Sequence, residues 1–235
     1  MTKLNVTVWN ETTNAIGPYQ DGIHNALADF IKKSGEFGTV RTAVLTQPEH
    51  GLTEEVLNDT DVLTWWGHSH HGKVEDAIVD RVRKRVLDGM GIIVLHSGHA
   101  SKIFARLMGT DTSKLRWREK DELERVWCIE PSHPIAKGVP EHFDIPKSEM
   151  YGELFHIPTP DELIFVSWYE GGEIFRSGCT FKRGLGRVFY FSPGHESLPI
   201  YYMPEIQRVI MNGIHWAAPS FRKDIVTGHV PEFMQ

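Results

Sequence analysis

Histidines gather in three short segments of this sequence. The segment WWGHSHHG, residues 65–72, holds two tryptophans and three histidines directly after an apolar run. In GIIVLHSGHAS, residues 91–101, His96 ends an apolar run, and in FYFSPGHES, residues 189–197, His195 stands beside Glu196. Neutral imidazoles bind zinc and related divalent metals, and they also transfer protons near neutral pH. These segments therefore predict metal binding or acid-base chemistry.

A divalent metal site is one interpretation of WWGHSHHG. If the segment is extended, His68 and His70 lie on the same side, because side chains alternate along a strand. Joined by His96 or His195, they would supply the nitrogen ligands that zinc prefers. We therefore predict a divalent cation, with zinc first, at these four histidines.

Two other interpretations of the same segment stay open. In a metal-free sugar pocket, Trp65 and Trp66 would stack on sugar faces while the histidines bind hydroxyl groups. Alternatively, both tryptophans belong to the core and the histidines form a solvent-facing loop.

The segment VLHSGHAS has the layout of a nucleophile elbow, in which a sharp strand-to-helix turn presents one side chain. His96 takes the presented position, and we predict it as a catalytic residue, with Ser97 beside it as a substrate contact. The competing interpretation is that His96 only caps the strand through backbone hydrogen bonds.

The pair of His195 and Glu196 also follows an apolar strand. A histidine beside a carboxylate is an acid-base pair or a metal ligand with the group that orients it. We predict both residues as catalytic, with Glu196 orienting His195.

Further candidates come from two segments. In EMYGELFHIP, residues 149–158, alternation places Glu149, Tyr151 and Glu153 on one side. We favour Glu153 as a catalytic carboxylate and Tyr151 as a substrate contact, while Glu149 fits an exposed strand edge equally well. In YQDGIH, Tyr19 and Asp21 are predicted substrate contacts, and Asp21 is equally suited to cap the following helix.

The elements that must position these residues alternate between strand and helix in the first half of the chain. β-branched or apolar runs at 4–10, 40–46, 60–67 and 90–98 predict strands, and amphipathic patterns predict helices at 19–35, 53–59, 74–89 and 100–109. This order predicts an α/β fold with a doubly wound, mainly parallel sheet of the flavodoxin-like type. Ligands in such sheets bind at the carboxyl ends of the strands, where the histidines are predicted.

The pattern changes after residue 110, where short β-like runs are broken by proline and glycine. We predict an antiparallel extension of the same sheet, with a hairpin over residues 179–193 that turns at RGLG. A helix over residues 203–219 closes a single domain that spans residues 1–235.

Composition narrows the possible partners and location. The net charge of −6 argues against nucleic acid, and the basic cluster at 81–89 fits the solvated side of a helix. No apolar run reaches the roughly 20 residues that a membrane span needs, and no signal peptide is evident, so we expect a cytoplasmic protein. Cys128 and Cys179 are expected to be free thiols. A homo-oligomer is the expected assembly.

The order of segments resembles the class I glutamine amidotransferase-like fold. In that fold a strand-turn-helix presents a cysteine, and a late strand ends in histidine and glutamate, as VLHSGHAS and SPGHES do here. His96 occupies the cysteine position, so amidohydrolysis through a thioester is excluded.

A narrower resemblance covers nearly the whole chain. The segments GPYQDGIH, WWGHSHHG, GIIVLHSGHASK, MYGELFHIPTPDELIFVSWYEGGEIFRSGCTF and GRVFYFSPGHES look like the ThuA-like, or trehalose utilisation, family. The resemblance implies the amidotransferase-like fold without its cysteine and an enzyme of sugar catabolism acting on disaccharides or their 3-keto derivatives. The alternative is a non-catalytic sugar-binding or regulatory protein that uses the same crevice.

Overall fold

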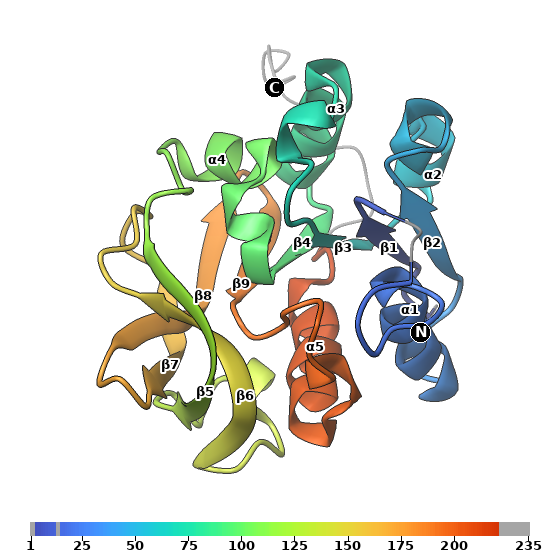
Figure 1. Ribbon diagram of the computed structural model, residues 1–235. Coiled ribbons are helices and arrows are strands. Elements are labelled where there is room, and N and C mark those ends of the chain that lie inside the picture. The colour runs from blue at the N-terminus through green and yellow to red at the C-terminus, as the bar shows by residue number, and fades with distance from the viewer. Residues whose placement is uncertain (1–2, 13–14, 221–235) are drawn as a thin grey trace, which may run out of the picture.

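The computed structural model describes residues 3–12 and 15–220. One nine-stranded sheet runs through it in the order β2-β1-β3-β4-β9-β8-β7-β5-β6 (Figure 1). The strands are β1 Val6–Asn10, β2 Val40–Val44, β3 Val62–Trp66, β4 Gly91–Leu95, β5 Arg116–Cys128, β6 His142–Gly152, β7 Glu162–Tyr169, β8 Ile174–Arg183 and β9 Gly186–Phe191. The α-helices are α1 Ile23–Lys33, α2 Glu54–Asn58, α3 Asp76–Leu87, α4 Lys102–Met108 and α5 Pro204–Ala217. None of the helices in the described part of the chain combines the length and apolar character of a transmembrane segment.

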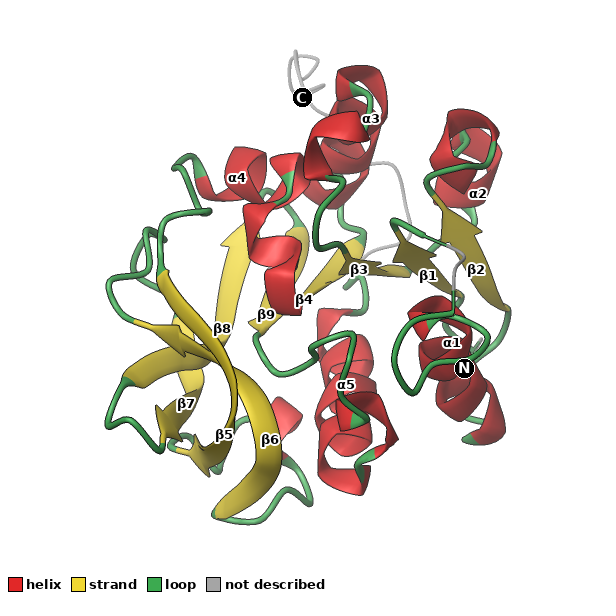
Figure 2. Cartoon of the chain, viewed as in Figure 1, coloured by secondary structure: helices red, strands yellow, loops and turns green. Residues whose placement is uncertain are grey.

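Five strands, β2-β1-β3-β4-β9, pair in parallel and form the predicted α/β part. Helices α1 and α5 pack on one face of this part, and α2, α3 and α4 pack on the other (Figure 2). Every residue of β1, β3 and β4 is buried, because these short apolar strands are covered on both faces. Strands β3, β4 and β9 are adjacent and parallel, so their carboxyl ends lie side by side. The three histidine segments follow these ends.

The other half of the sheet, β9-β8-β7-β5-β6, pairs in antiparallel fashion. The predicted antiparallel extension and the hairpin are present, with Arg183 opposite Gly186 at the turn. The prediction of a mainly parallel sheet is wrong, because the two longest strands, β5 and β6, belong to the antiparallel half. The physical reason is that no α-helix separates the strands from β5 to β9, and parallel pairing needs such a crossover.

The antiparallel half bends back over the parallel half. The pairing of β5 with β6 shifts register between Glu119 and Glu124, where Asp121 adopts a φ of 54°. Such bulges bend a strand and increase its twist. Strand β6 also contacts β8, and Figure 1 shows β5 and β6 curving across the front of the molecule. This bend brings the edge strand β6 toward the strand ends that carry the histidines.

Candidate functional site

His96 is the first residue of the 3-10 turn His96–Ala100, which connects β4 to α4. Its φ of 48° lies in the left-handed region, which residues other than glycine seldom adopt, as expected for an elbow. The ring is 2% exposed, and its Nδ1–H donates to the carbonyl oxygen of Ser192 at 2.9 Å. Because Nδ1 carries this proton, Nε2 is the atom that faces the other groups of the site.

Glu149, on β6, is the first of those groups. Its Oε2 lies 3.2 Å from His96 Nε2, and both side chains are buried. Burial by itself lowers the pKa of His96, but its contact with Glu149 outweighs this effect and raises that pKa above its usual value. Burial likewise raises the pKa of Glu149, and the contact with His96 lowers it below its usual value. The two groups thus form a buried ion pair.

Tyr151 lies on the same strand and covers the His96 ring. The two rings stack with centroids 5.2 Å apart, and the tyrosine hydroxyl is 3.4 Å from His96 Nε2. The same hydroxyl is 2.9 Å from Ser97 Oγ, which in turn is 3.1 Å from His68 Nδ1. The two predicted substrate contacts, Tyr151 and Ser97, therefore link the imidazoles of His96 and His68.

His195 comes from the loop after β9, and the local backbone fixes its ring. The N–H of Ser197 donates to His195 Nδ1 at 3.2 Å, and Ser197 Oγ lies 2.8 Å from the same atom. Gly194 has a φ of 146°, and a Cβ there would lie 2.0 Å from the hydroxyl of Tyr201, so this turn requires glycine. Since Nδ1 accepts a hydrogen bond, the neutral ring carries its proton on Nε2. Burial and the neighbouring charge of His96 lower the pKa of His195, which favours this neutral form.

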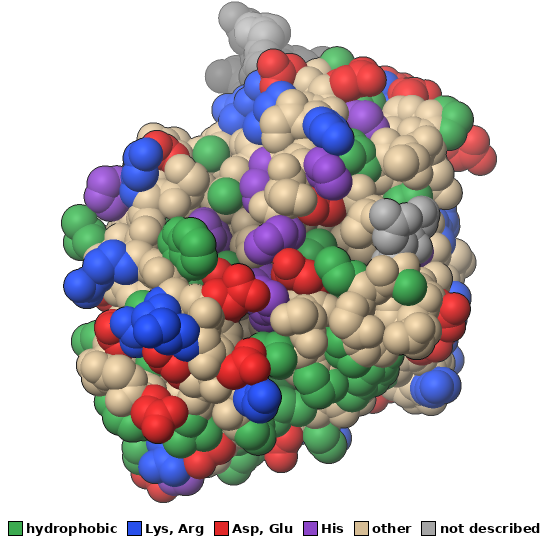
Figure 3. Space-filling model, in the orientation of Figure 1, with side chains coloured by type: hydrophobic (Ala, Val, Ile, Leu, Met, Phe, Trp, Pro, Cys, Tyr) green, Lys and Arg blue, Asp and Glu red, His purple; other side chains and the backbone are tan. Residues whose placement is uncertain are grey.

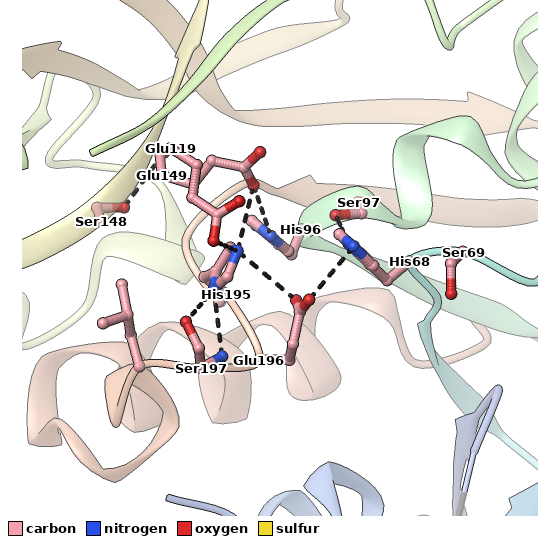
Figure 4. Close-up of polar contacts among 12 residues, drawn as sticks. His68, Ser69, His96, Ser97, Glu119, Ser148, Glu149, His195, Glu196 and Ser197 are labelled. Atoms are coloured by element: carbon pink, nitrogen blue, oxygen red, sulfur yellow. Dashed lines mark hydrogen bonds and ion pairs between the residues drawn. The ribbon is translucent and has the colours of Figure 1, made fainter. Parts of the chain in front are cut away.

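Glu196 contacts His68 more closely than it contacts His195. Its Oε1 is 3.2 Å from His68 Nε2, whereas its Oε2 is 3.9 Å from His195 Nε2 (Figure 4). The structure gives little support for the prediction that Glu196 orients His195, because Ser197, two residues further on, makes the hydrogen bonds to the ring. Glu196 and His68 instead form a second histidine-carboxylate pair beside that of His96 and Glu149.

Two carboxylate oxygens in this site accept no hydrogen bond of good geometry from the described residues, although one of them, Oε2 of Glu149, lies in the ion pair with His96. They are Oε2 of Glu149 and Oε2 of Glu196, and both are buried. Both lie near one atom, at 4.0 Å and 3.9 Å from His195 Nε2. Two overlapping groups have ligand atoms within 4.8 Å of one another, namely His68, His96 and Glu196, and His96, Glu149 and His195. Figure 3 shows histidine and acidic side chains gathered near the centre of one face.

The structure does not place both histidines of the predicted WWGHSHHG pair in this cluster. His70 lies apart from it, with Nδ1 3.6 Å from Oε1 of Glu11. Strand β3 ends at Trp66, so residues 67–70 are not extended and the alternation that predicted a shared side does not apply. The buried Glu11 accepts the N–H groups of Ser69 and His70 and anchors this loop, a role that the sequence analysis missed.

The structure gives no support for the predicted sugar contacts of Trp65, Trp66 and Tyr19, because all three are buried. Trp65 and Trp66 are each 1% exposed, because β3 is covered on both faces. Trp65 stacks on Trp9 with ring centroids 3.9 Å apart, and Trp66 donates from Nε1 to the carbonyl of Gly194. Tyr19 is fully buried, and its hydroxyl donates to the carbonyl of Leu198.

Two predicted carboxylates also lie outside the cluster. Glu153 follows the end of β6 and forms an ion pair with Arg176 at 2.8 Å, while it also accepts N–H groups of Phe155 and Arg176. These contacts occupy both oxygens, so the structure gives no support for its predicted catalytic role. Asp21 is exposed in the loop before α1 and does not cap that helix with its side chain, so the structure gives no support for its predicted contact with substrate.

Two carboxylates of the cluster are not predicted by the sequence patterns: Glu119 stands out in no motif, and Glu149 fits an exposed strand edge equally well. Glu119, on β5, places Oε1 3.5 Å from His195 Nε2. It pairs directly with Glu149 in the β5–β6 ladder, so both carboxylates are on the same face of the sheet. The alternation of side chains along EMYGELF was the available signal for Glu149. That pattern shows which residues share a face of the strand, but it does not show whether this face is turned toward the histidines.

The comparisons with solved structures show the same fold. A ThuA-like protein from Parabacteroides merdae aligns with a TM-score of 0.73 and 16% identity over 98% of this chain and 94% of that one. A cytoplasmic protein of Salmonella typhimurium aligns with a TM-score of 0.62 and 13% identity over 92% of this chain and 100% of that one. A β-galactosidase from Bacillus circulans aligns with a TM-score of 0.58 and 12% identity over 93% of this chain but only 32% of the enzyme.

At the level of sequence, no curated protein matches this chain. The family model for ThuA, described as trehalose utilisation, matches residues 5–217. That match covers most of the chain, including all the residues of the cluster. The chain therefore belongs to the ThuA, or trehalose utilisation, family.

Proposed function

We propose that this protein is an enzyme of sugar catabolism that processes a disaccharide or its 3-keto derivative at the histidine-carboxylate cluster. The family description supports the pathway, and the cluster supports a catalytic role. A cytoplasmic location and a homo-oligomeric assembly complete the proposal, and the Salmonella relative described as cytoplasmic supports the location. Light scattering during size-exclusion chromatography would test the assembly.

The observation that carries the proposal is the pair of buried carboxylate oxygens, Oε2 of Glu149 and Oε2 of Glu196, that accept no hydrogen bond of good geometry. Burying carboxylate oxygens in this way, one of them with only the ion pair to His96, is costly for a protein that only needs to fold. Here both oxygens lie within 4.0 Å of His195 Nε2, in a group of ionisable residues drawn from four separate segments. A substrate or a cation that interacts with these oxygens would offset this cost.

A divalent cation fits this donor set. His96 Nδ1 is bonded to a carbonyl and His68 Nδ1 lies beside a hydroxyl, so Nε2 of each ring faces a carboxylate of the cluster, and a cation between them would replace the direct contacts with Glu149 and Glu196. Together with Glu149 and Glu196, these histidines would hold the ion, and zinc or manganese suits such ligands. A bound cation would polarise an oxygen of the sugar.

His195 has a different role in this proposal. Its Nδ1 accepts a hydrogen bond from the backbone, so its Nε2 presents an N–H and not a lone pair. We assign it as a hydrogen-bond donor that binds and orients the glycosidic oxygen, because the N–H of a neutral imidazole is too weak an acid to be transferred. Glu119 and Glu149, near the same N–H, would hold the ring in place.

Turnover tests the proposal. The untagged protein, purified without chelator, would be incubated with trehalose and with 3-keto-trehalose, each with zinc or manganese and each with EDTA. We expect release of monosaccharide from one of these substrates and a lower rate in EDTA. A stable complex with the sugar but no product under any condition would instead favour the non-catalytic sugar-binding protein.

A further inference from the structure

Trp117, on β5, is an unusual surface residue. Its side chain is 65% exposed, whereas Trp65 and Trp66 are almost completely buried. No ring stacking or cation–π contact of Trp117 is found within the described residues. Covering this exposed apolar ring with a ligand would remove apolar area from water and would therefore be favourable.

The strand register places Trp117 on the face of the sheet that carries the site. Trp117 pairs directly with Tyr151, and Glu119 pairs directly with Glu149. Directly paired residues in an antiparallel ladder share a face, and residues two apart on one strand also share a face. Glu119 reaches His195, and Tyr151 stacks on His96. Trp117 is therefore on the same face of the sheet as Glu119 and Tyr151, and this face is turned toward His195 and His96.

From this placement we propose that Trp117 is a binding platform for a sugar ring of the substrate. Two residues along a strand span about 7 Å, so Trp117 lies roughly one pyranose ring beyond Glu119. The flat indole would stack on the apolar face of a sugar that extends away from the reacting bond, and its N–H would remain free for a hydroxyl. This inference rests on the proposed function and specifies that the substrate has a second sugar unit.

The surroundings of Trp117 favour a sugar over a protein partner. Arg116 and Arg118, the adjacent residues on β5, alternate to the opposite face, so the nearest side chains on the face of Trp117 are Glu119 and Tyr151. The surface beside the ring is therefore the polar site itself and not a further apolar patch. The cores of protein interfaces are depleted of charged residues, whereas a lone aromatic ring among polar groups is typical of a small-ligand site.

The test is an NMR titration of the indole N–H signals with trehalose. The signal of Trp117 is identified by its loss in Trp117→Phe, and Trp168 on β7, 37% exposed, serves as the control tryptophan. We expect a saturable shift of the Trp117 signal and none for Trp168. The affinity for trehalose should fall about tenfold, or ~1.4 kcal/mol, in Trp117→Ala. In Trp117→Phe it should change less, because an aromatic face remains.

The outcomes separate this inference from the proposed function. If trehalose shifts signals of the histidine cluster but leaves Trp117 unmoved, the platform is refuted while the proposed function stands. The platform is also refuted if Trp117→Ala changes the oligomeric state and leaves the sugar affinity intact, since Trp117 then belongs to an interface. If neither trehalose nor its 3-keto derivative binds, both proposals fail.

Discussion

Nε2 of His96 lies 3.2 Å from Oε2 of Glu149, although β4, which leads into His96, is a central strand and β6, which carries Glu149, is the edge strand of the sheet. The bend of the antiparallel half creates this contact. It joins the elbow after β4 to a carboxylate near the C-terminal end of β6. The proposed chemistry depends on it.

Metal binding is predicted at His68 and His96. Replacing either by alanine removes one imidazole ligand, and we expect bound metal to fall by more than about tenfold with the fold preserved. The control is His215→Ala, because this histidine is exposed on α5 and pairs with Glu36. Elemental analysis of the untagged proteins measures the metal content of each variant. Equal zinc or manganese content in all variants would show that the ion binds elsewhere.

The ion pair of Glu153 and Arg176 is predicted to stabilise the fold in a pH-dependent way. Burial raises the pKa of Glu153, but the hydrogen bonds of Arg176 and the backbone outweigh it and hold that pKa below 4.5. Because the folded-state pKa is lowered, this stabilisation is present above pH 4.5 and is lost as the pH falls through the lowered value. Glu153→Gln should therefore reduce the free energy of unfolding by about 1–3 kcal/mol at neutral pH and by much less in acid.

Urea unfolding followed by circular dichroism at several pH values measures this difference. Turnover of the folded Glu153→Gln variant should stay close to that of the wild type, because Glu153 lies outside the cluster. A large loss of turnover without a loss of stability would return Glu153 to the catalytic residues.

The thiols are predicted to take no part in catalysis. Cys128 and Cys179 are both free, and burial raises the pKa of Cys179 to about 12, so it is not a thiolate at neutral pH. Replacing either by serine should leave turnover within about twofold, although a buried hydroxyl at position 179 should lower stability slightly. Steady-state kinetics of both variants would check this. Complete loss of turnover in a folded Cys128→Ser protein would contradict it.

Much of the site could be predicted from the sequence, because His96 and His195 closely follow strands whose apolar runs are clear. In a parallel sheet such ends meet at one edge, and the structure brings both residues there with His68. Glu149 and Glu119 could not be assigned in the same way. Their position depends on a bulge at Asp121 and on the bend of an edge strand, and neither has a clear sequence pattern.

Other predictions failed for local reasons. Trp65 and Trp66 suggest an aromatic binding surface, but a five-residue strand covered on both faces buries alternate side chains equally. Side-chain alternation, which predicted a shared side for His68 and His70, holds only where the backbone is extended. Strand β3 ends at Trp66, before both histidines. In each case tertiary packing overrode a pattern that was consistent locally.

The most direct test of the central claim is the turnover number of Glu149→Gln on the sugar that the wild type processes. Glutamine keeps the size of the side chain but removes the charge that pairs with His96. We predict that kcat falls by about 100-fold or more while the protein stays folded. Asp144→Asn is the control, because this carboxylate lies on the same strand and pairs with Arg125 at the surface. A Glu149→Gln enzyme with the kcat of the wild type would contradict the assignment of the cluster as the catalytic site.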